Sequence, residues 1–255
     1  KTLVTAAASA ALGLTLAAPA QADLFAYAKV LLTDFTISGS NGQIINNGTD
    51  ITGLNYTSSA DMDGTLTGTP GFPTYSVPNG VNTDFPATCL TTSGDCGPPL
   101  PIGDDNDFPF ITGPQGADYI AGDQLENGSP ISGVPGPGGV DPTTPATIGG
   151  LAVGSLSQTN AAGSANVNNG LEANWQFSLT QDQGITFAGN VATYLEAFAS
   201  AGEVFPGKAS AATTFEITIT DLVSGAIVFN SADETGTNLL NQTTSVNAGG
   251  FPIDI

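Results

Sequence analysis

Histidine and arginine are both missing from this chain, and lysine occurs only three times in 255 residues. Acyl-transfer triads, phosphate clamps and zinc-hydrolase sites depend on these basic or metal-binding side chains. None of them can be assembled from the residues present, so we predict a protein that is not an enzyme. With 23 acidic residues and a net charge of −20, the chain also repels nucleic acid and anionic lipid, and we predict no nucleic-acid partner.

Cysteine is nearly as scarce, because Cys89 and Cys96 are the only two. Two cysteines without histidine do not complete a zinc site, which takes about four ligands. In an exported chain, two cysteines this close in sequence are most simply a local disulfide, which contributes about 2 to 3 kcal/mol for so short a loop.

The first residues have the pattern of a secretory leader. A lysine precedes an apolar, alanine-rich run over residues 3–18, and the small residues Ala20 and Ala22 lead into Asp23. This pattern predicts a signal peptide at residues 1–22, cleaved between Ala22 and Asp23. A membrane-spanning helix is the alternative, but the run is shorter than the roughly 20 residues that a span requires. We therefore expect an exported protein.

What the sequence has in abundance is strict alternation of apolar and polar side chains. It is clearest over Leu171–Thr180, where Trp175 takes an apolar position and Glu172 a polar one. A period of two is typical of a strand with one buried face. The pattern returns over Phe215–Thr220, and the turn-rich residues 221–225 then lead into a predicted return strand, forming a hairpin.

Other segments extend this β pattern through the chain. Leu24–Ser38 predicts a first long strand, and Ile51–Thr57 a shorter one, while Val191–Ala199 fits either a strand or a short helix. Several strands separated by turns, without alternating long helices, predict an all-β fold. We expect an antiparallel β-sandwich or jelly-roll-like domain.

Proline marks a different region, because fourteen of the seventeen prolines lie between Pro70 and Pro145. Proline has no amide donor for a sheet ladder, so it is found at edges and in loops. We therefore predict one β-domain over residues 23–255, with residues 70–146 as a long Pro/Gly-rich loop insertion.

Oxygen-rich segments suggest calcium as a candidate cofactor. Asp61 and Asp63 lie in one turn-prone sequence, and Asp104, Asp105, Asn106 and Asp107 lie in another. Calcium prefers carboxylate and carbonyl oxygens, although neither segment completes an EF-hand loop. Acidic, solvated loops without a metal are the alternative interpretation.

Two carbohydrate-related hypotheses can also be formulated from the residues present. A glycoside hydrolase would need two facing carboxylates, for which the candidates are Glu172, Glu196 and Glu216. Glutamates at polar strand positions are equally well explained as solvated side chains. A carbohydrate-binding module would instead need an exposed aromatic platform, drawn from Trp175, Tyr27, Tyr56, Tyr75, Tyr119 and Tyr194.

Several segments in order resemble the bodies of bacterial PEP-CTERM proteins. After the leader these are Leu31–Ile37, Gly116–Gly122, Trp175–Leu179, Ile185–Phe187, Tyr194–Phe198, Ala209–Thr220 and Gly225–Phe229. The resemblance implies an exported β-rich protein of a biofilm-forming Gram-negative bacterium, with no catalytic residues to transfer. The family's Pro-Glu-Pro motif, membrane helix and arginine cluster do not occur before Ile255, so either the chain is truncated or the resemblance is confined to the β-domain.

Together these observations favour a structural or adhesive protein at the outer cell surface, associated with exopolysaccharide or with copies of itself. Any membrane attachment would depend on a C-terminal anchor outside this sequence. A carbohydrate- or calcium-binding module is the second hypothesis, and a carboxylate-based glycoside hydrolase is the third.

Overall fold

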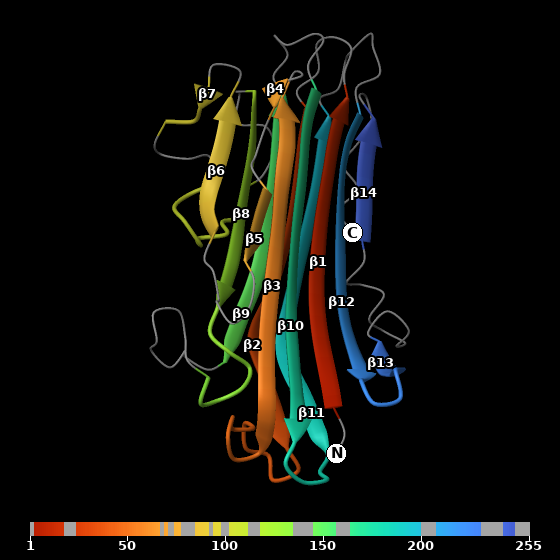
Figure 1. Ribbon diagram of the computed structural model, residues 1–255. Helices are drawn as coiled ribbons and strands as arrows, with labels where there is room; N and C mark the ends of the chain where they lie inside the picture. Colours follow the sequence, from red (N-terminus) through yellow and green to blue (C-terminus); the bar gives the residue numbers. More distant parts are fainter. Residues whose placement is uncertain are drawn as a thin grey trace.

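A computed structural model shows an all-β chain whose long strands form two antiparallel sheets packed face to face (Figure 1). This is the predicted β-sandwich. The structure describes residues 3–17, 24–66, 69–70, 74–77, 85–91, 94–97, 102–111, 118–134, 145–156, 164–199, 208–230 and 242–247. Within these ranges, no helix has the length and apolar character needed to cross a membrane.

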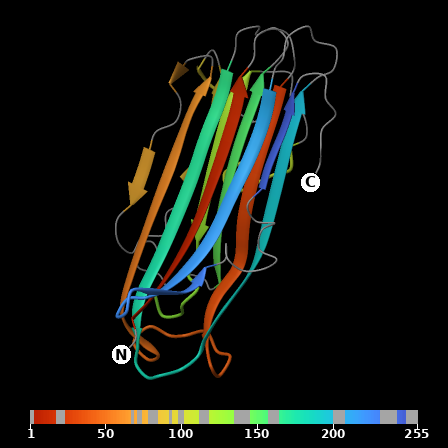
Figure 2. The same ribbon diagram turned by 90° about the vertical axis from the view of Figure 1, so that its right-hand side faces the viewer.

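Sheet A is built around four long strands that run in the order β12, β1, β10, β3, with shorter strands at its edges. Seen from the side, these strands extend along most of the molecule (Figure 2). The sheet contains β1 (Leu3–Ala17), β3 (Ile51–Leu66), β4 (Thr69–Pro70), β5 (Thr74–Val77), β10 (Ser164–Leu179), β12 (Lys208–Asp221), β13 (Ala226–Asn230) and β14 (Gln242–Asn247).

Sheet B has the order β11, β2, β9, β8, β6, β7. Its strands β2 and β9 are buried along most of their length, because sheet A covers one face and a loop covers part of the other. The sheet contains β2 (Leu24–Gly39), β6 (Phe85–Thr91), β7 (Gly94–Asp95), β8 (Tyr119–Asn127), β9 (Ala146–Leu156) and β11 (Ile185–Ala199).

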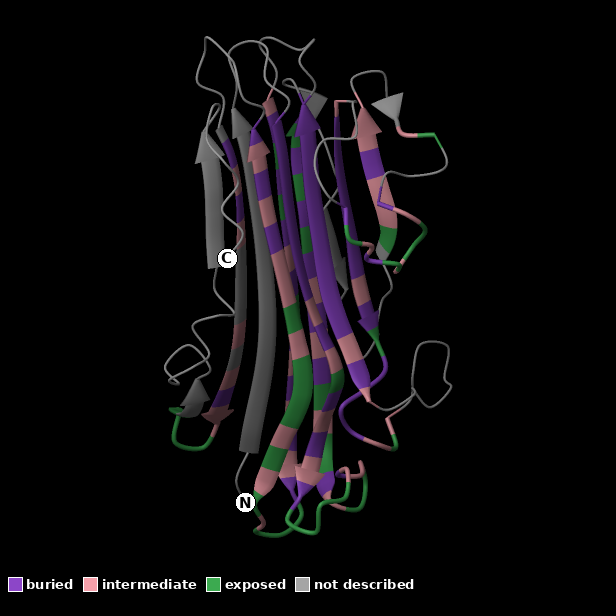
Figure 3. Cartoon of the chain, turned by 180° about the vertical axis from the view of Figure 1, so that it is seen from behind, coloured by how far each residue is buried: buried purple, intermediate pink, exposed green. Residues whose placement is uncertain are grey.

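The main core lies between the sheets and follows the alternation that the sequence shows. Along β10, every second residue from Ala165 to Leu179 is buried, and the intervening side chains are exposed or half-buried. From behind, with sheet B in front, Figure 3 shows the nearly complete burial of β9. Trp175 is only 3% exposed and packs against Phe35 of sheet B and Tyr56 of β3. The prediction that Trp175 is a core residue is therefore confirmed.

Strand β2 departs from simple alternation because it contains a β-bulge. Pairing with β9 shifts register between Leu32 and Phe35, and Asp34 in between has a φ of 54°. Because of the extra residue, the side chains that face sheet A are the even-numbered ones before the bulge and the odd-numbered ones after it. Phe25 and Tyr27 therefore pack on the outer face of sheet B, whereas Phe35 and Ile37 join the core between the sheets.

Two further sequence expectations are resolved by the strand pairing. Residues 191–199 continue β11 as a strand, because they pair in register with β2, and the helical alternative is excluded. Within the proline-rich residues 70–146, β8 is hydrogen-bonded to β9 on one side and to β6 on the other, so this segment belongs to sheet B. Much of the remaining predicted insertion lies outside the described residues.

Candidate functional site

The outward face of β3 and β10 is a long, continuous polar surface. The two strands pair in register, with Asp63 beside Asn168 and Ser59 beside Glu172. Between Asn55 and Ser178, the outward positions carry hydroxyl, amide or carboxylate side chains, apart from Gly170. They are Asn55, Thr57, Ser59, Asp61, Asp63 and Thr65 on β3, and Asn166, Asn168, Glu172, Asn174, Gln176 and Ser178 on β10. We call this surface the polar face.

Hydrogen bonds between neighbouring side chains organise the polar face. The Asn168 amide donates to a carboxylate oxygen of Asp63 at 3.1 Å, and the Asn174 amide donates to Glu172 at 2.8 Å. Asp61, Asp63 and Glu172 are all exposed, so each carboxylate keeps access to solvent. The arrangement can accept hydrogen bonds from hydroxyl groups or bind cations loosely from outside.

Asp61 and Asp63 do not lie in a turn, as the sequence suggested, but within the second half of β3. The flanking Ala60 and Met62 are buried and the two aspartates are exposed, which extends the alternation of β3 through this segment. A turn-prone sequence was thus overridden by pairing with β10 on one side and with β5 on the other.

The second acidic segment forms a turn that is fastened to the outer face of sheet B. An oxygen of Asp105 accepts the Ala87 amide at 2.7 Å, and Asp123 of β8 accepts the Asn106 amide at 2.9 Å. A carboxylate oxygen of Asp107 accepts the Asp104 amide at 3.3 Å. These contacts attach the turn to β6 and β8 through carboxylates that calcium would otherwise use.

The two candidate calcium segments lie on opposite sides of the sandwich. Asp123 contacts the acidic turn, whereas the next residue, Gln124, points inward to sheet A and donates to a backbone oxygen of Gly170 at 3.0 Å. Successive strand residues face opposite sides of a sheet. The segments therefore cannot share one ion, and the described residues contain no group of three or more His, Cys, Asp or Glu suited to a metal.

Residues 102–111, which contain the acidic turn, cap a second hydrophobic cluster on the outside of sheet B. Phe108 of this cap is buried against the cluster, which includes Phe25 and Tyr27. The Tyr27 hydroxyl donates to the Pro109 carbonyl at 2.5 Å, and the Lys29 ammonium donates to the Phe108 carbonyl at 2.6 Å. Burial lowers the pKa of Lys29, since desolvation disfavours the ammonium.

The same cap displays Phe110, which is 69% exposed. Its ring lies over the Lys29 ammonium, with 4.5 Å between the nitrogen and the ring centroid. The ring also packs against Tyr194 in an edge-to-face arrangement, with 5.2 Å between the two ring centroids. Sequence reasoning missed Phe110 because it considered only tryptophan and tyrosine as candidate sugar platforms. The short Phe-Pro-Phe sequence at residues 108–110 was the available signal.

The predicted aromatic platform is not formed by the described residues that were proposed for it. Trp175, Tyr27, Tyr56 and Tyr119 are all buried, with exposures of 5% or less, and Tyr194 is half-buried. The side chain of Tyr75 lies outside the described residues. Of the candidate rings whose side chains are described, none is exposed, so none provides the platform that the carbohydrate-binding hypothesis requires.

The three candidate catalytic glutamates do not converge on one cleft. Glu172 and Glu216 lie on the outer face of sheet A, and in both cases Ser9 of β1 is the paired residue, so they are two strands apart. Glu196 lies on the outer side of sheet B, where its carboxylate accepts the Tyr194 hydroxyl at 2.9 Å.

The interior contains a polar cluster that the sequence did not reveal. Asn169 of β10 is buried, and its amide donates to the Asp123 carbonyl at 3.0 Å and to the Leu151 carbonyl at 2.8 Å. Its side-chain oxygen accepts the Gln124 amide. Asn169 thus connects sheet A to both β8 and β9 of sheet B.

Glu126 lies two residues beyond Gln124 on the same side of β8, facing the interior. It is 3% exposed, and neither carboxylate oxygen has a hydrogen-bond partner among the described residues. Burial raises the pKa of Glu126 to about 8, because desolvation penalises the charged form. A proline-rich surrounding sequence hid this position, since β8 was not predicted as a core strand.

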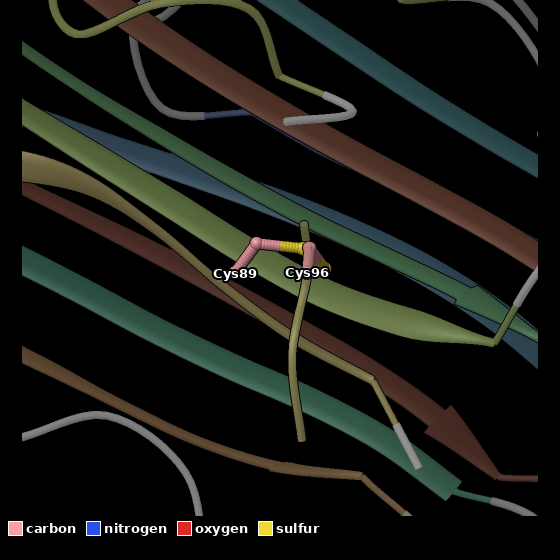
Figure 4. Close-up of a disulfide and its surroundings, with 2 residues drawn as sticks. All are labelled: Cys89 and Cys96. Carbon is pink, nitrogen blue, oxygen red and sulfur yellow. A yellow bond between two sulfur atoms is a disulfide. The ribbon is translucent and has the colours of Figure 1, made fainter. Parts of the chain in front are cut away.

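Cys89 and Cys96 form the predicted disulfide (Figure 4), with 5.3 Å between their Cα atoms. The bridge joins the end region of β6 to the residue that follows β7, where the Cys96 amide also donates to the Cys89 carbonyl at 3.3 Å. The predicted cleavage residues Ala20, Ala22 and Asp23 lie outside the described residues. Comparisons with protein-family models, curated proteins and solved structures gave no match.

Reduction of the disulfide is expected to lower the free energy of unfolding by about 2 kcal/mol. The physical reason is that the short chain segment between Cys89 and Cys96 regains conformational freedom in the unfolded state. Urea unfolding with and without dithiothreitol measures the effect. The Cys89→Ser, Cys96→Ser double variant is the control, and its unfolding midpoint should not respond to reductant; an equal midpoint for the oxidised and reduced wild type would contradict the prediction.

Proposed function

We propose that this chain is an exported, non-catalytic structural or adhesive protein of the bacterial cell surface, associated with the exopolysaccharide matrix. The observation that carries the proposal is the polar face: two adjacent strands of sixteen residues that present hydroxyl, amide and carboxylate groups outward. These groups can hydrogen-bond many sugar hydroxyls along one flat surface. The leader pattern, the net charge of −20 and the resemblance to PEP-CTERM proteins support the same proposal.

Calcium is the proposed link between the polar face and other anionic partners. The carboxylates of the polar face and of the acidic turn are all exposed. Asp63 and Glu172 accept only neighbouring side-chain amides among the described bonds, whereas Asp105 and Asp107 accept the backbone amides that hold the turn in place. Exposed carboxylates with free oxygen acceptors suit a hard cation that is also held by water and by an acidic polysaccharide. The carboxylates of the polar face are therefore better placed to bridge to partners than those of the acidic turn.

Localisation in the native cells tests the proposed export. We expect the protein in the cell-surface or matrix fraction, with an N-terminus at Asp23 by mass spectrometry. A deletion strain should form less adherent biofilm, and the wild-type gene should restore it. Recovery of the protein in the cytoplasmic fraction, with residues 1–22 still attached, would contradict the proposal.

Millimolar calcium is expected to increase binding of the protein to an acidic polysaccharide such as alginate. In the Asp61→Asn, Asp63→Asn double variant, we expect this increase to fall at least threefold, because two exposed carboxylates are neutralised without disturbing the core. The Asp104→Asn variant is the matched control, since its carboxylate lies on the other side of the molecule. Co-sedimentation measures binding, and an equal response in the double variant and wild type would remove the polar face from the proposal.

A further inference from the structure

Among the aromatic side chains that the structure describes, Phe110 alone is exposed, at 69%. Its backbone is fixed on both sides, because Phe108 and Ile111 of the same cap are buried, at 4% and 7% exposure. The fold of the cap itself thus keeps this apolar ring in water, on the outer side of sheet B that faces the viewer in Figure 3.

Two further contacts fix the orientation of the Phe110 ring. The Lys29 ammonium lies 4.5 Å from the ring centroid, and Tyr194 packs edge-to-face with 5.2 Å between the two ring centroids. Lys29 is only 8% exposed, so its ammonium covers the inward face of the ring and the opposite face is open to solvent. A ligand that stacks on the open face meets a ring that is already ordered, which lowers the entropy cost of binding.

Polar groups lie directly beside the ring. Where β11 pairs with β2, Tyr194 is opposite Lys29 and Glu196 is opposite Tyr27. The Tyr194 hydroxyl donates to the Glu196 carboxylate at 2.9 Å, and both side chains are half-buried. Phe110, Tyr194 and Glu196 therefore form one surface that passes from an apolar ring to a hydroxyl and a carboxylate. We call these three residues the Phe110 site.

A neutral pyranose ring has the chemistry that matches the Phe110 site. Its C–H groups can stack on an aromatic face, and its hydroxyl groups can donate to a carboxylate. An organic cation fits less well, because the Lys29 ammonium already occupies the other face of the Phe110 ring and repels a second positive charge. An acidic sugar also fits less well, since Glu196 and the acidic turn make this side of the molecule negative.

A protein partner is also less well matched to this surface. The centre of a protein interface is a contiguous apolar patch. The other large apolar side chains that are exposed among the described residues, Val223 and Ile227, lie at the β12–β13 hairpin of sheet A instead. The apolar contact at the Phe110 site is confined to one ring, which suits a single sugar unit better than a protein surface.

We propose that the Phe110 site binds a neutral pyranose unit of a polysaccharide, with the C–H face of the sugar stacked on Phe110 and its hydroxyl groups hydrogen-bonded to Glu196. The biological setting of this site rests on the proposed polysaccharide association, but the binding itself needs neither calcium nor the polar face. The two surfaces lie on opposite sides of the sandwich. A chain that carries both would connect a neutral polysaccharide to an acidic one.

Saturation-transfer NMR on the full chain tests the site. The neutral probes are cellohexaose, mannohexaose and N-acetylchitohexaose, and the aromatic protons of the protein are irradiated selectively. We expect saturation to reach the C–H protons of at least one neutral probe in the presence of EDTA, with an affinity that titration measures. Oligogalacturonate, which is acidic, and choline, which is cationic, should bind more weakly than that probe.

Substitutions at the site separate stacking from general adhesion. Phe110→Ala and Phe110→Leu should each bind about tenfold more weakly, because neither offers a flat ring, whereas Phe110→Trp should bind at least as well as wild type. Glu196→Gln should bind about threefold more weakly, since an amide oxygen accepts weaker hydrogen bonds than a carboxylate. Val223→Ala is the matched control, because it shortens a similarly exposed apolar side chain elsewhere, and its binding should be unchanged. Circular dichroism checks that all variants fold as wild type does.

Three outcomes would overturn the inference. They are no saturation transfer to any neutral probe, equal binding by wild type and Phe110→Ala, and tighter binding of choline or oligogalacturonate than of the neutral sugars. The Asp61→Asn, Asp63→Asn variant separates the inference from the proposed function, because it should bind neutral sugars as wild type does. Failure of calcium-dependent alginate binding therefore leaves the Phe110 site standing, and failure of neutral-sugar binding leaves the polar face standing.

Discussion

Replacing Glu126 with glutamine is expected to raise the free energy of unfolding by about 3 kcal/mol at pH 7 and to leave it nearly unchanged at pH 4. Burial without a described hydrogen-bond partner raises the pKa of this carboxyl from 4.5 to about 8. Each unit of pKa difference between folded and unfolded states corresponds to about 1.4 kcal/mol. Glutamine has nearly the same shape as glutamate and carries no charge. It therefore removes the free-energy cost of keeping this carboxyl protonated in the folded state, without opening a cavity.

The sign follows from proton binding in the two states. Below pH 4.5, Glu126 is protonated in both the folded and unfolded chain, and its contribution does not depend on pH. Between pH 4.5 and about 8, the unfolded chain has lost the proton while the folded chain retains it, so stability falls as pH rises. Above about pH 8 the Glu126 carboxyl is also deprotonated in the folded chain, and the free energy of unfolding falls no further with pH.

Urea unfolding of the wild type and Glu126→Gln at several pH values between 4 and 9 measures this effect. The difference between the two proteins should grow through that window. Glu172→Gln is the matched control, because Glu172 is exposed on the polar face and its replacement should change stability little at any pH. Parallel stability curves for wild type and Glu126→Gln across the window would show that Glu126 is not a buried acid.

Replacing Asn169 with alanine is expected to lower the free energy of unfolding by about 3 kcal/mol. The substitution removes two hydrogen bonds to the Asp123 and Leu151 carbonyls and one from the Gln124 amide. Each contributes about 1 kcal/mol, and leaving a buried group unsatisfied adds to the loss. These bonds connect the two sheets, so the variant should also unfold at lower temperature.

The neighbouring residue provides a control for this prediction. Asn168→Ala removes an exposed amide that bonds only Asp63 among the described contacts, and the expected loss is below about 0.5 kcal/mol. Thermal unfolding followed by circular dichroism compares the two variants in one experiment. Equal melting temperatures for Asn168→Ala and Asn169→Ala would mean that the buried amide does not hold the sheets together.

Alternation in the sequence was sufficient to predict β10, because its buried and polar residues follow a strict period of two and its neighbours cover only one face. The same reasoning was incomplete for β2, where both faces are buried and a bulge at Asp34 changes the parity of Phe35. Hydrophobic pattern alone cannot locate a bulge, since the extra residue is specified by pairing with β9 and β11.

The candidate site shows a similar division. The excess of exposed oxygen donors could be read from composition, and the placement of Glu172 on a polar face followed from parity. That Asp61 lies within a strand, or that Asp105 fastens a turn to Ala87, could not be predicted, because each depends on a residue distant in sequence. Proline enrichment likewise concealed β8, whose burial comes from the acidic turn on one face and sheet A on the other.

The sequence by itself determined that this protein is built from β-strands, that its surface is acidic and that Cys89 lies close enough in sequence to Cys96 to form a local bridge. These properties depend on composition and on patterns between near neighbours. Only the tertiary structure decided that Glu126 is a buried acid without a hydrogen-bond partner among the described residues, and that Leu3–Ala17 joins β10 to β12. Burial and strand pairing are created by distant segments coming together, which no local pattern specifies.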